Sequence, residues 1–394
     1  MSKAYVINTG IISAIGNNTA ENFQSLLQQR HGISMPEILH TAHQLPVAEI
    51  KQSGEQLMES LNIRELLPRT ALLSIHAARE AVAPFANALA DFRMALISGN
   101  TVGGMDLTEI YYKTYKDAPT ESNLAHVQYH ECGAITALTA EAIQHKGWST
   151  TISTACSSSA NSIMLAAQLI ESGQFDLVLA GGADGLSRFT LNGFNSLMIL
   201  DKMPCRPFDE NRQGLNLGEG AAYLLLAGEN AMHQLQATPL AIISGYANAN
   251  DAHHQTASSP EGLGNQLAMK GALQRAGISP EAVSYINLHG TGTSNNDSSE
   301  GIAIQHIFGE NVPPASSTKA YTGHTLGAAG AVEAVYSILA IQHQIIFPHL
   351  RWETPMQELS WKPATAMLTL PVQHVLSNSF GFGGNCSSLV ISKI

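Results

Sequence analysis

Residues 149–173 read STTISTACSSSANSIMLAAQLIESG, and two different patterns meet in this stretch. Residues 149–153 form a strand-like run. From Ser159 to Ser172 the apolar side chains recur at roughly helical spacing, at positions 163, 164, 167, 169 and 170. Gly173 follows as a helix C-cap. The stretch therefore predicts a strand, a short polar turn and a helix, a unit typical of layered α/β folds.

Further apolar runs that end at glycine occur on both sides of this unit. They cover residues 94–97, 177–180 and 285–288. Because helical patterns separate them, they predict buried strands in an α/β layered fold. A second helix is predicted over residues 328–342, whereas residues 31–60 look irregular and are expected to form a surface excursion.

Two segments of the chain have a similar pattern, in which a predicted strand leads into a turn. They lie at residues 4–10 and 241–245. They indicate two halves, divided near residue 238. The expected domains are residues 1–238, which carry Cys156, and residues 239–394, which carry the two histidines described below.

Composition excludes several classes of protein. The 394 residues are 44% hydrophobic and only 13% charged, against about 25% charged in ordinary soluble domains. Much of the chain must therefore be buried, which argues against disorder. The net charge of −11 disfavours nucleic-acid binding but allows a local basic patch for an acidic partner. Neither a membrane-spanning run nor a signal-peptide core is present, so a reducing cytoplasm is the expected setting.

Cys156 lies at the start of the predicted helix. There the helix dipole and the free N–H groups favour a thiolate, and the same N–H groups can hydrogen-bond an oxyanion. The alternative interpretation is a small buried hydrophobic side chain, which describes most free cysteines. The other cysteines lack this setting, form no C-x-x-C pair and are interpreted as structural: Cys132, Cys205 and Cys386.

Two histidines lie in glycine-containing loops. His289 ends a strand-like run in NLHGTGT, residues 287–293, and His324 precedes the second helix. Strand ends are where open α/β sheets bind ligands, but either histidine taken singly is more often structural. A third loop, NSFGFGGN at residues 378–385, has glycines that let the chain move and approach a ligand closely. No Walker, dinucleotide or H-E-x-x-H motif occurs, so neither a metal nor an organic cofactor is expected.

Taken together and in this order, these segments resemble the β-ketoacyl-acyl-carrier-protein synthases of the thiolase superfamily. The resemblance covers nearly the whole chain and rests on residues 154–159, 181–184, 206–209, 212, 218–221, 250–256, 289–293, 297–300, 317–330 and 378–384. It implies a duplicated thiolase-like fold with five αβαβα layers. It also implies a dimer whose interface lies near the nucleophile helix.

The resemblance assigns roles to individual residues. Cys156 matches the acylated nucleophile, and His289 and His324 match the two histidines of the condensing site. Lys319 matches the lysine of that site, and Glu300 matches its buried glutamate partner, so these two are expected to form an ion pair. The residues matched to substrate contacts are Phe382, the gating side chain; Thr291 and Thr293, which hold the pantetheine arm; and Val102, which lines the acyl pocket.

The implied reaction is a decarboxylative Claisen condensation. A thiolate takes up an acyl group, and the enolate formed when malonyl-acyl-carrier protein loses carbon dioxide attacks it. This implies a role in fatty-acid or polyene/polyketide elongation, as a homodimer or as the catalytic half of a heterodimer with a chain-length partner. A basic patch of Arg64, Arg69, Lys202 and Arg206 is expected to dock the carrier; the alternative is that these cations are merely solvated, or that Arg206 is tied to Asp209.

The sequence departs from the family pattern at two places, and three alternative functions are weighed against the proposed one. Asn385-Cys386 stands where the family usually has Thr-Asn, and residues 130–133 also differ from the fatty-acid enzymes. This pattern is closer to synthases of aryl-polyene or related pigment clusters. A thiolase with Cys386 as second reactive cysteine is an alternative, although the two histidines and Lys319 fit the synthase better. His324 argues against a synthase primed by coenzyme A, and Cys156 argues against a non-catalytic subunit.

Overall fold

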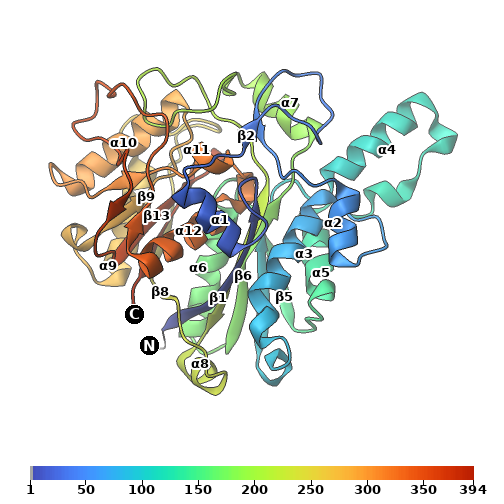
Figure 1. Ribbon diagram of the computed structural model, residues 1–394, viewed down its shortest axis with the longest axis horizontal. Helices are drawn as coiled ribbons and strands as arrows, with labels where there is room; N and C mark the ends of the chain where they lie inside the picture. Colours follow the sequence, from blue (N-terminus) through green and yellow to red (C-terminus); the bar gives the residue numbers. More distant parts are fainter. Residues whose placement is uncertain (1–2) are drawn as a thin grey trace.

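The computed structural model describes residues 3–394. Its central feature is a ten-stranded sheet in the order β10-β9-β13-β14-β8-β1-β7-β6-β4-β5 (Figure 1). The strands of the N-terminal half are β1 (Ala4–Ser13), β4 (Met94–Gly99), β5 (Trp148–Ile152), β6 (Leu177–Asp184) and β7 (Gly220–Ala227). Those of the C-terminal half are β8 (Ala241–Asn250), β9 (Tyr285–Asn287), β10 (Ala315–Ser316), β13 (His374–Phe380) and β14 (Asn385–Ser392).

The two halves repeat one connectivity. In each half, the first strand pairs antiparallel with the fifth, and the fifth pairs antiparallel with the fourth. The fourth strand then pairs in parallel with the second, and the second pairs in parallel with the third. The halves join where β1 residues 4–6 pair antiparallel with β8 residues 241–243. The expected duplication and α/β class are therefore confirmed, and the exact domain boundary at residue 238 stays a prediction.

Helices cover both outer faces of this sheet system and fill its centre. The helices are α1 (Thr19–Leu27), α2 (Gly54–Leu61), α3 (Arg69–Val82), α4 (Met105–Asp117), α5 (Cys132–Ala142), α6 (Ser158–Glu171), α7 (Arg188–Ser196), α8 (Glu229–Gln234), α9 (Leu263–Ala276), α10 (Ser294–Phe308), α11 (Lys319–Thr322) and α12 (Ala329–His343). Helices α3 and α5 pack outside the N-terminal half, and α9 and α10 outside the C-terminal half. Helices α6 and α12 lie between the two half-sheets, which gives five layers.

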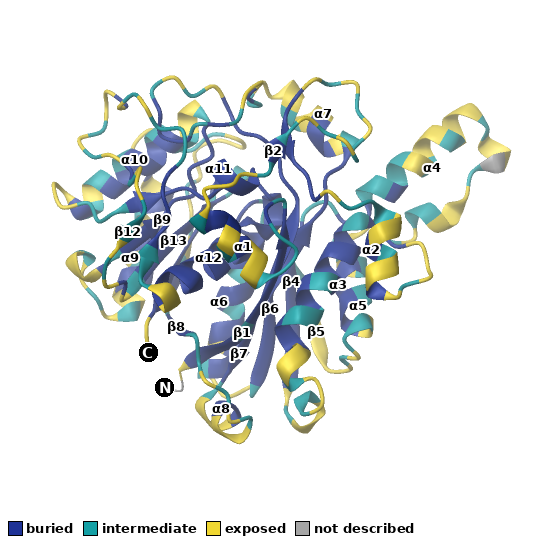
Figure 2. Cartoon of the chain, in the orientation of Figure 1, coloured by how far each residue is buried: buried dark blue, intermediate teal, exposed yellow. Residues whose placement is uncertain are grey.

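Period-2 alternation explains why the central helices are enclosed. In β1, Ala4 and Val6 face the central core, whereas Tyr5 and Ile7 face the outer core under α3. In β9, Tyr285 and Ile286 divide in the same way. Because each strand is apolar on both faces, helix α12 is buried along almost its whole length (Figure 2). The predicted helices at 159–172 and 328–342 are confirmed to within a residue or two as α6 and α12.

The interpretation of residues 31–60 as an irregular surface excursion is only partly right. The segment contains two short strands, β2 (Ile33–Ser34) and β3 (Val47–Ala48), and helix α2. Ser53 and Gln56 form a capping box that starts α2, a signal present in the sequence. The remaining short strands, β11 (Ile345–Ile346) and β12 (Leu368–Thr369), form a separate two-stranded sheet. None of the helices in residues 3–394 combines the length and apolar character that crossing a bilayer requires.

Candidate active site

Cys156 lies in a tight turn between the end of β5 and the start of α6. Ala155 has a φ of +52°, a left-handed conformation that costs energy for any residue other than glycine. Ser158 holds the turn, because its hydroxyl accepts from the N–H of Thr154 at 2.9 Å and donates to the carbonyl of Ala155 at 2.6 Å. The turn presents the thiol at the helix N-terminus, where the sequence placed it, and leaves the side chain buried.

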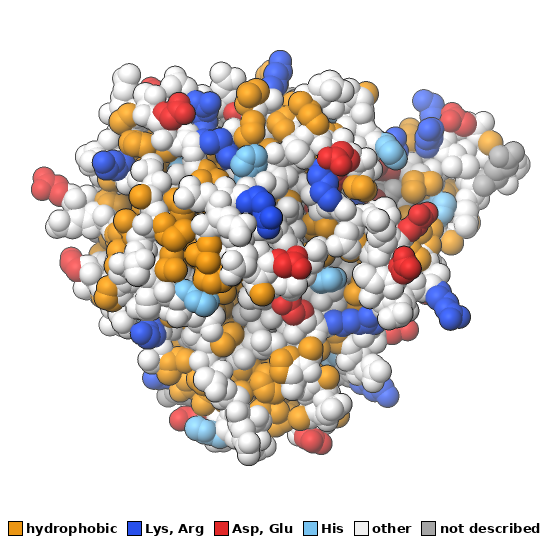
Figure 3. Space-filling model, viewed as in Figure 1, with side chains coloured by type: hydrophobic (Ala, Val, Ile, Leu, Met, Phe, Trp, Pro, Cys, Tyr) orange, Lys and Arg blue, Asp and Glu red, His pale blue; other side chains and the backbone are white. Residues whose placement is uncertain are grey.

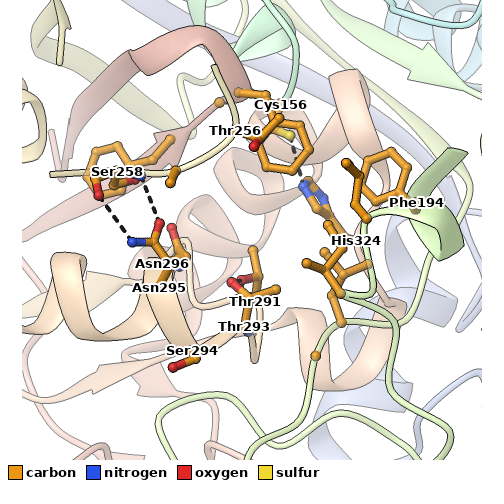
Figure 4. Close-up of a pocket in the computed structure, with 18 of the residues that line it drawn as sticks. Cys156, Phe194, Thr256, Ser258, Thr291, Thr293, Ser294, Asn295, Asn296 and His324 are labelled. Atoms are coloured by element: carbon orange, nitrogen blue, oxygen red, sulfur yellow. Dashed lines mark hydrogen bonds between the residues drawn. The ribbon is translucent and has the colours of Figure 1, made fainter. Parts of the chain in front are cut away.

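Two histidines reach this thiol from the C-terminal half. His289 follows β9, and His324 follows α11 through Gly323, whose φ is +63°. Nε2 of His324 lies 3.0 Å from Sγ of Cys156 (Figure 4). The imidazole rings of His289 and His324 meet edge to face with centroids 5.3 Å apart. One atom from each of Cys156, His289 and His324 lies within 4.8 Å of the other two. Three residues from distant loops therefore converge on one small volume.

Lys319 fixes the protonation of His289. Its buried Nζ lies 3.1 Å from Nδ1 of His289 and 2.6 Å from the carbonyl of the same residue. An ammonium has donors only, so Nδ1 must accept and the ring proton must sit on Nε2. His289 therefore points a donor into the site. A metal ion needs a lone pair there, so the Cys-His-His triangle is built for a reacting oxygen rather than for a metal.

The expected ion pair between Lys319 and Glu300 is wrong. The carboxylate that pairs with Lys319 is Glu333, on α12, and both side chains are buried. Glu300 instead accepts from the backbone N–H groups of His289 at 2.9 Å and Gly290 at 2.8 Å, and from the side chain of Asn378. Burial raises the pKa of Glu300 to about 7 despite these donors. Its role is to hold the loop that carries His289.

The expectation that the helix end lowers the pKa of the nucleophile is also wrong. Burial raises the pKa of the Cys156 thiol to about 11, although Lys319 and the backbone N–H of Phe382 act in the opposite direction. Burial, followed by the charge of Lys319, holds the pKa values of His289 and His324 well below the ordinary value. The free site therefore holds a neutral thiol beside neutral imidazoles, and His324 is placed to accept the thiol proton.

We expect alkylation of Cys156 to accelerate by roughly tenfold for each pH unit from about pH 7 to about pH 10. Below its pKa a thiol gains thiolate in this proportion as pH rises, and the pKa here is about 11. The measurement is the rate at which iodoacetamide labels the Cys156 peptide, followed by mass spectrometry. A plateau below about pH 8 would instead show a preformed thiolate–imidazolium pair.

The glycine loop at residues 381–384 completes the site. The backbone N–H groups of Phe382 and Cys156 both lie toward the thiol. A side chain at Gly381 would meet the carbonyl oxygen of Thr154 at 3.0 Å, so glycine is needed where the loop touches the nucleophile turn. These two N–H groups are placed to hydrogen-bond an oxyanion that develops on an acyl group bound to the sulfur.

Two cavities meet at Cys156. The first, of about 390 Å³, contains Thr291, Thr293 and His324 among its walls (Figure 4). The second, also of about 390 Å³, is mostly apolar; it contains Val102 and reaches the surface at Phe189. The residues that line both cavities are Cys156, Phe194, Leu197 and Phe382. The Phe194 and Phe382 rings stack with centroids 5.8 Å apart and so separate the two spaces.

The four predicted docking cations do not share one environment. Arg64 and Lys202 are exposed, and Arg206 is partly exposed, 4.0 Å from Glu353. The prediction that Arg69 helps to dock the carrier is wrong, because its side chain is largely buried and pairs with Glu219 at 2.6 Å. On the face shown in Figure 3, basic side chains are scattered among acidic and uncharged ones.

The sequence interpretation missed two residues of the site. Glu333 is the single carboxylate in the otherwise apolar helix α12, a signal that could have identified the partner of Lys319. Phe194, on α7, carries no comparable signal, because only the tertiary fold brings it against Phe382. Cys386, the alternative second reactive cysteine, packs in the outer core, donates to Asn265 and lines neither cavity.

Known proteins share both the sequence and the architecture. Residues 2–231 match the family model of the β-ketoacyl synthase N-terminal domain, and residues 240–353 match that of the C-terminal domain. The chain is 32% identical over 412 residues to 3-oxoacyl-[acyl-carrier-protein] synthase 2 of Staphylococcus aureus, covering 99% of this chain and 98% of the relative. It is 33% identical over 417 residues to the enzyme of the same name from Coxiella burnetii, covering both chains completely.

Solved structures agree with this assignment. A ketosynthase from Xenorhabdus doucetiae, in complex with its chain length factor, superimposes with a TM-score of 0.85 at 33% identity, over 100% of this chain and 98% of that one. The ishigamide ketosynthase/chain length factor gives a TM-score of 0.93 at 27% identity, over 100% and 99%. The chain therefore belongs to the β-ketoacyl synthase family of thiolase-like condensing enzymes.

Proposed function

We propose that this chain condenses an acyl group held on Cys156 with malonyl-acyl-carrier protein, with loss of carbon dioxide, to give a β-ketoacyl-carrier product. One observation carries the proposal. The thiol, a locked Nε2–H donor from His289 and the ring of His324 converge within 4.8 Å where two cavities meet. One cavity suits a pantetheine arm, and the apolar one suits an acyl chain.

The first half-reaction is acyl transfer. His324 accepts the thiol proton across 3.0 Å while sulfur attacks the thioester carbonyl. The N–H groups of Cys156 and Phe382 hold the oxyanion, and the carrier thiol leaves with the proton from His324. Nδ1 of His324 has no hydrogen-bond partner among residues 3–394, so this ring can hold its proton on either nitrogen. His289, by contrast, is locked by Lys319.

The second half-reaction needs donors rather than a base. When malonyl thioester loses carbon dioxide, the negative charge appears on the enolate oxygen. Nε2–H of His289 is aimed into the site, and once sulfur is acylated His324 can also turn an Nε2–H donor toward that oxygen. The enolate carbon then attacks the acyl carbonyl, a carbon–carbon bond forms, and the Cys156 thiolate leaves.

The experiment that tests this function compares substrates. Incubation with acyl-carrier and malonyl-carrier protein should yield a β-ketoacyl-carrier product and carbon dioxide, identified by intact mass. Acetyl-coenzyme A alone should give no product, whereas a thiolase would couple two acetyl groups. The same masses identify the acyl chains that the enzyme accepts, of fatty-acid or aryl-polyene type. The proposed setting is the cytoplasm, where a catalytic thiol stays reduced.

We further propose that the enzyme works with a second ketosynthase-like subunit, as a homodimer or as the catalytic half of a heterodimer. Helix α4 projects from the body of the molecule (Figure 1) and exposes Ile110, Tyr112 and Tyr115, which are 47%, 66% and 50% exposed. The apolar cavity opens nearby, at Phe189. A partner covering this region would close the acyl site. The heterodimer is favoured by the solved relative bound to a chain length factor. Native mass spectrometry distinguishes the two assemblies.

Carrier docking is expected to depend on the exposed cations. The combined change Lys202→Glu and Arg206→Glu should raise KM for carrier-bound substrate by about tenfold, because charges at the rim of an interface act mainly on encounter. A small pantetheine thioester should react at the unchanged rate. Arg64→Glu tests the third cation separately. Equal losses on both substrates would contradict docking and indicate damage to the fold.

A further inference from the structure

The loop that carries Phe382 has little rigidity of its own. Three of its four residues are glycine, and Gly383 and Gly384 have φ values of +82° and +80°. Yet Phe382 stands between the two cavities and supplies an N–H to the thiol site. Something outside the loop must therefore fix its position.

Asn385 ends this loop and begins β14, at a position where the sequence departs from the family pattern. Its carbonyl accepts from the N–H of Gly381 at 2.9 Å, which closes the loop at its base. Its side-chain Oδ1 lies 2.7 Å from the hydroxyl of Ser157, 2.9 Å from Nδ2 of Asn161 and 2.7 Å from Nδ2 of Asn248. One oxygen thus gathers three donors from two other elements.

These donors connect the loop to the nucleophile. Ser157 is the residue after Cys156 and the N-cap position of α6; Asn161 lies one turn further along the same helix, and Asn248 lies on β8. Asn161 also donates to the hydroxyl of Thr154, the residue at the start of the turn that carries Cys156. We call Ser157, Asn161, Asn248 and Asn385 the loop latch.

In the loop latch, the number of donors around Oδ1 of Asn385 can be compared with the lone pairs that this oxygen offers. An amide oxygen has two lone pairs, which the two asparagine donors can fill. Ser157 has a single proton, and its hydroxyl also lies 2.7 Å from the carbonyl of Thr154, so it can turn between two acceptors. Replacing the oxygen of Asn385 by an apolar group would remove the acceptor that Asn161 and Asn248 share and so cut the side-chain link between the loop and the nucleophile turn, although Asn161 keeps Thr154 and Asn248 keeps Ser387 as acceptors.

We infer that Asn385 is a positioning residue that holds the Phe382 loop against the nucleophile turn and so controls access to Cys156. The inference rests on the proposed function only in assuming that the substrate arms pass this loop. With Asn385 in place the Phe194–Phe382 stack is held between the cavities. Without it, the loop keeps the backbone hydrogen bonds from Gly383 to the carbonyl of Gln255 and from Asp251 to the carbonyl of Gly384, but it loses its side-chain link to the nucleophile turn, so the Phe382 end can move and the passage to Cys156 can widen.

The test measures access to Cys156 directly. Rates of labelling by iodoacetamide and by a bulky fluorescein maleimide are compared at the Cys156 peptide, so that Cys132 does not interfere. Asn385→Leu keeps the side-chain size but removes the acceptor, and should raise the bulky-to-small rate ratio about tenfold, whereas Asn385→Asp keeps the acceptors and should stay within about twofold of the parent.

Two further variants test the interpretation, one as a control and one as an independent change within the loop latch. Ser387→Ala removes a donor to Asn161 at 2.6 Å and an acceptor for Asn248 without touching Asn385, so the ratio should not change. Asn248→Ala removes one latch donor from an exposed side chain and should shift the ratio in the same direction as Asn385→Leu, even where the leucine variant folds poorly.

An unchanged ratio in Asn385→Leu and Asn248→Ala, or an equal change in Asn385→Asp and Ser387→Ala, would overturn the inference. Acylation of the parent enzyme by acyl-carrier protein is measured in parallel. Its failure would count against the proposed function alone, because labelling access does not depend on condensation.

Discussion

Cys156→Ala is expected to abolish acyl-enzyme formation and condensation while still releasing carbon dioxide from malonyl-carrier protein. Acyl transfer needs the sulfur, but decarboxylation needs only donors for the enolate oxygen. The variant leaves those donors in place, because His289 is fixed by Lys319 and not by the cysteine. Two measurements suffice, the mass of the acylated protein and the release of labelled carbon dioxide.

His289→Ala should give the opposite pattern. Cys156 and His324 keep their 3.0 Å contact, so the cysteine can still be acylated. Decarboxylation should fall by roughly 10²–10³-fold, the usual cost of losing one preorganised donor. His233→Ala serves as the control, since that exposed histidine lines neither cavity. Condensation by Cys156→Ala, or normal decarboxylation by His289→Ala, would contradict these roles.

The sequence predicted the fold well where the local pattern and the tertiary environment agree. Helix α6 has an amphipathic pattern and a glycine stop, and the structure places it within a residue of the prediction. Strands buried on both faces were recognisable as apolar runs ending at glycine. The prediction for residues 31–60 missed β2 and β3 because each is only two residues long, too short to show a strand pattern.

The site was predictable as a set of residues but not as a set of contacts. Loop motifs located Cys156, His289 and His324, and the structure brings them together. The family resemblance then suggested Glu300 as the partner of Lys319, whereas helix packing supplies Glu333 instead. The prediction of a lowered pKa for Cys156 failed for a similar reason, because the helix end is visible in the sequence and the depth of burial is not.

Arg69 is the clearest case of a charge misread from the sequence, and its replacement is expected to have a large effect on stability. Its guanidinium pairs with Glu219 and donates to the carbonyl groups of Ile50 and Gln52. Glu219 is fully buried and also accepts from the backbone N–H groups of Ile50 and Leu186. The pair therefore ties helix α3 to the segment before α2 and to the end of β6.

Arg69→Met should lower the free energy of unfolding by about 3–5 kcal/mol, because it leaves the Glu219 carboxylate buried without its cation. Arg64→Met, at an exposed site in the loop that precedes α3, should change it by less than about 0.5 kcal/mol. Urea denaturation measures both. The double variant Arg69→Met/Glu219→Leu should lose less than the sum of the two single changes, since no lone charge remains buried. Equal stability of Arg69→Met and Arg64→Met would show that Arg69 acts at the surface after all.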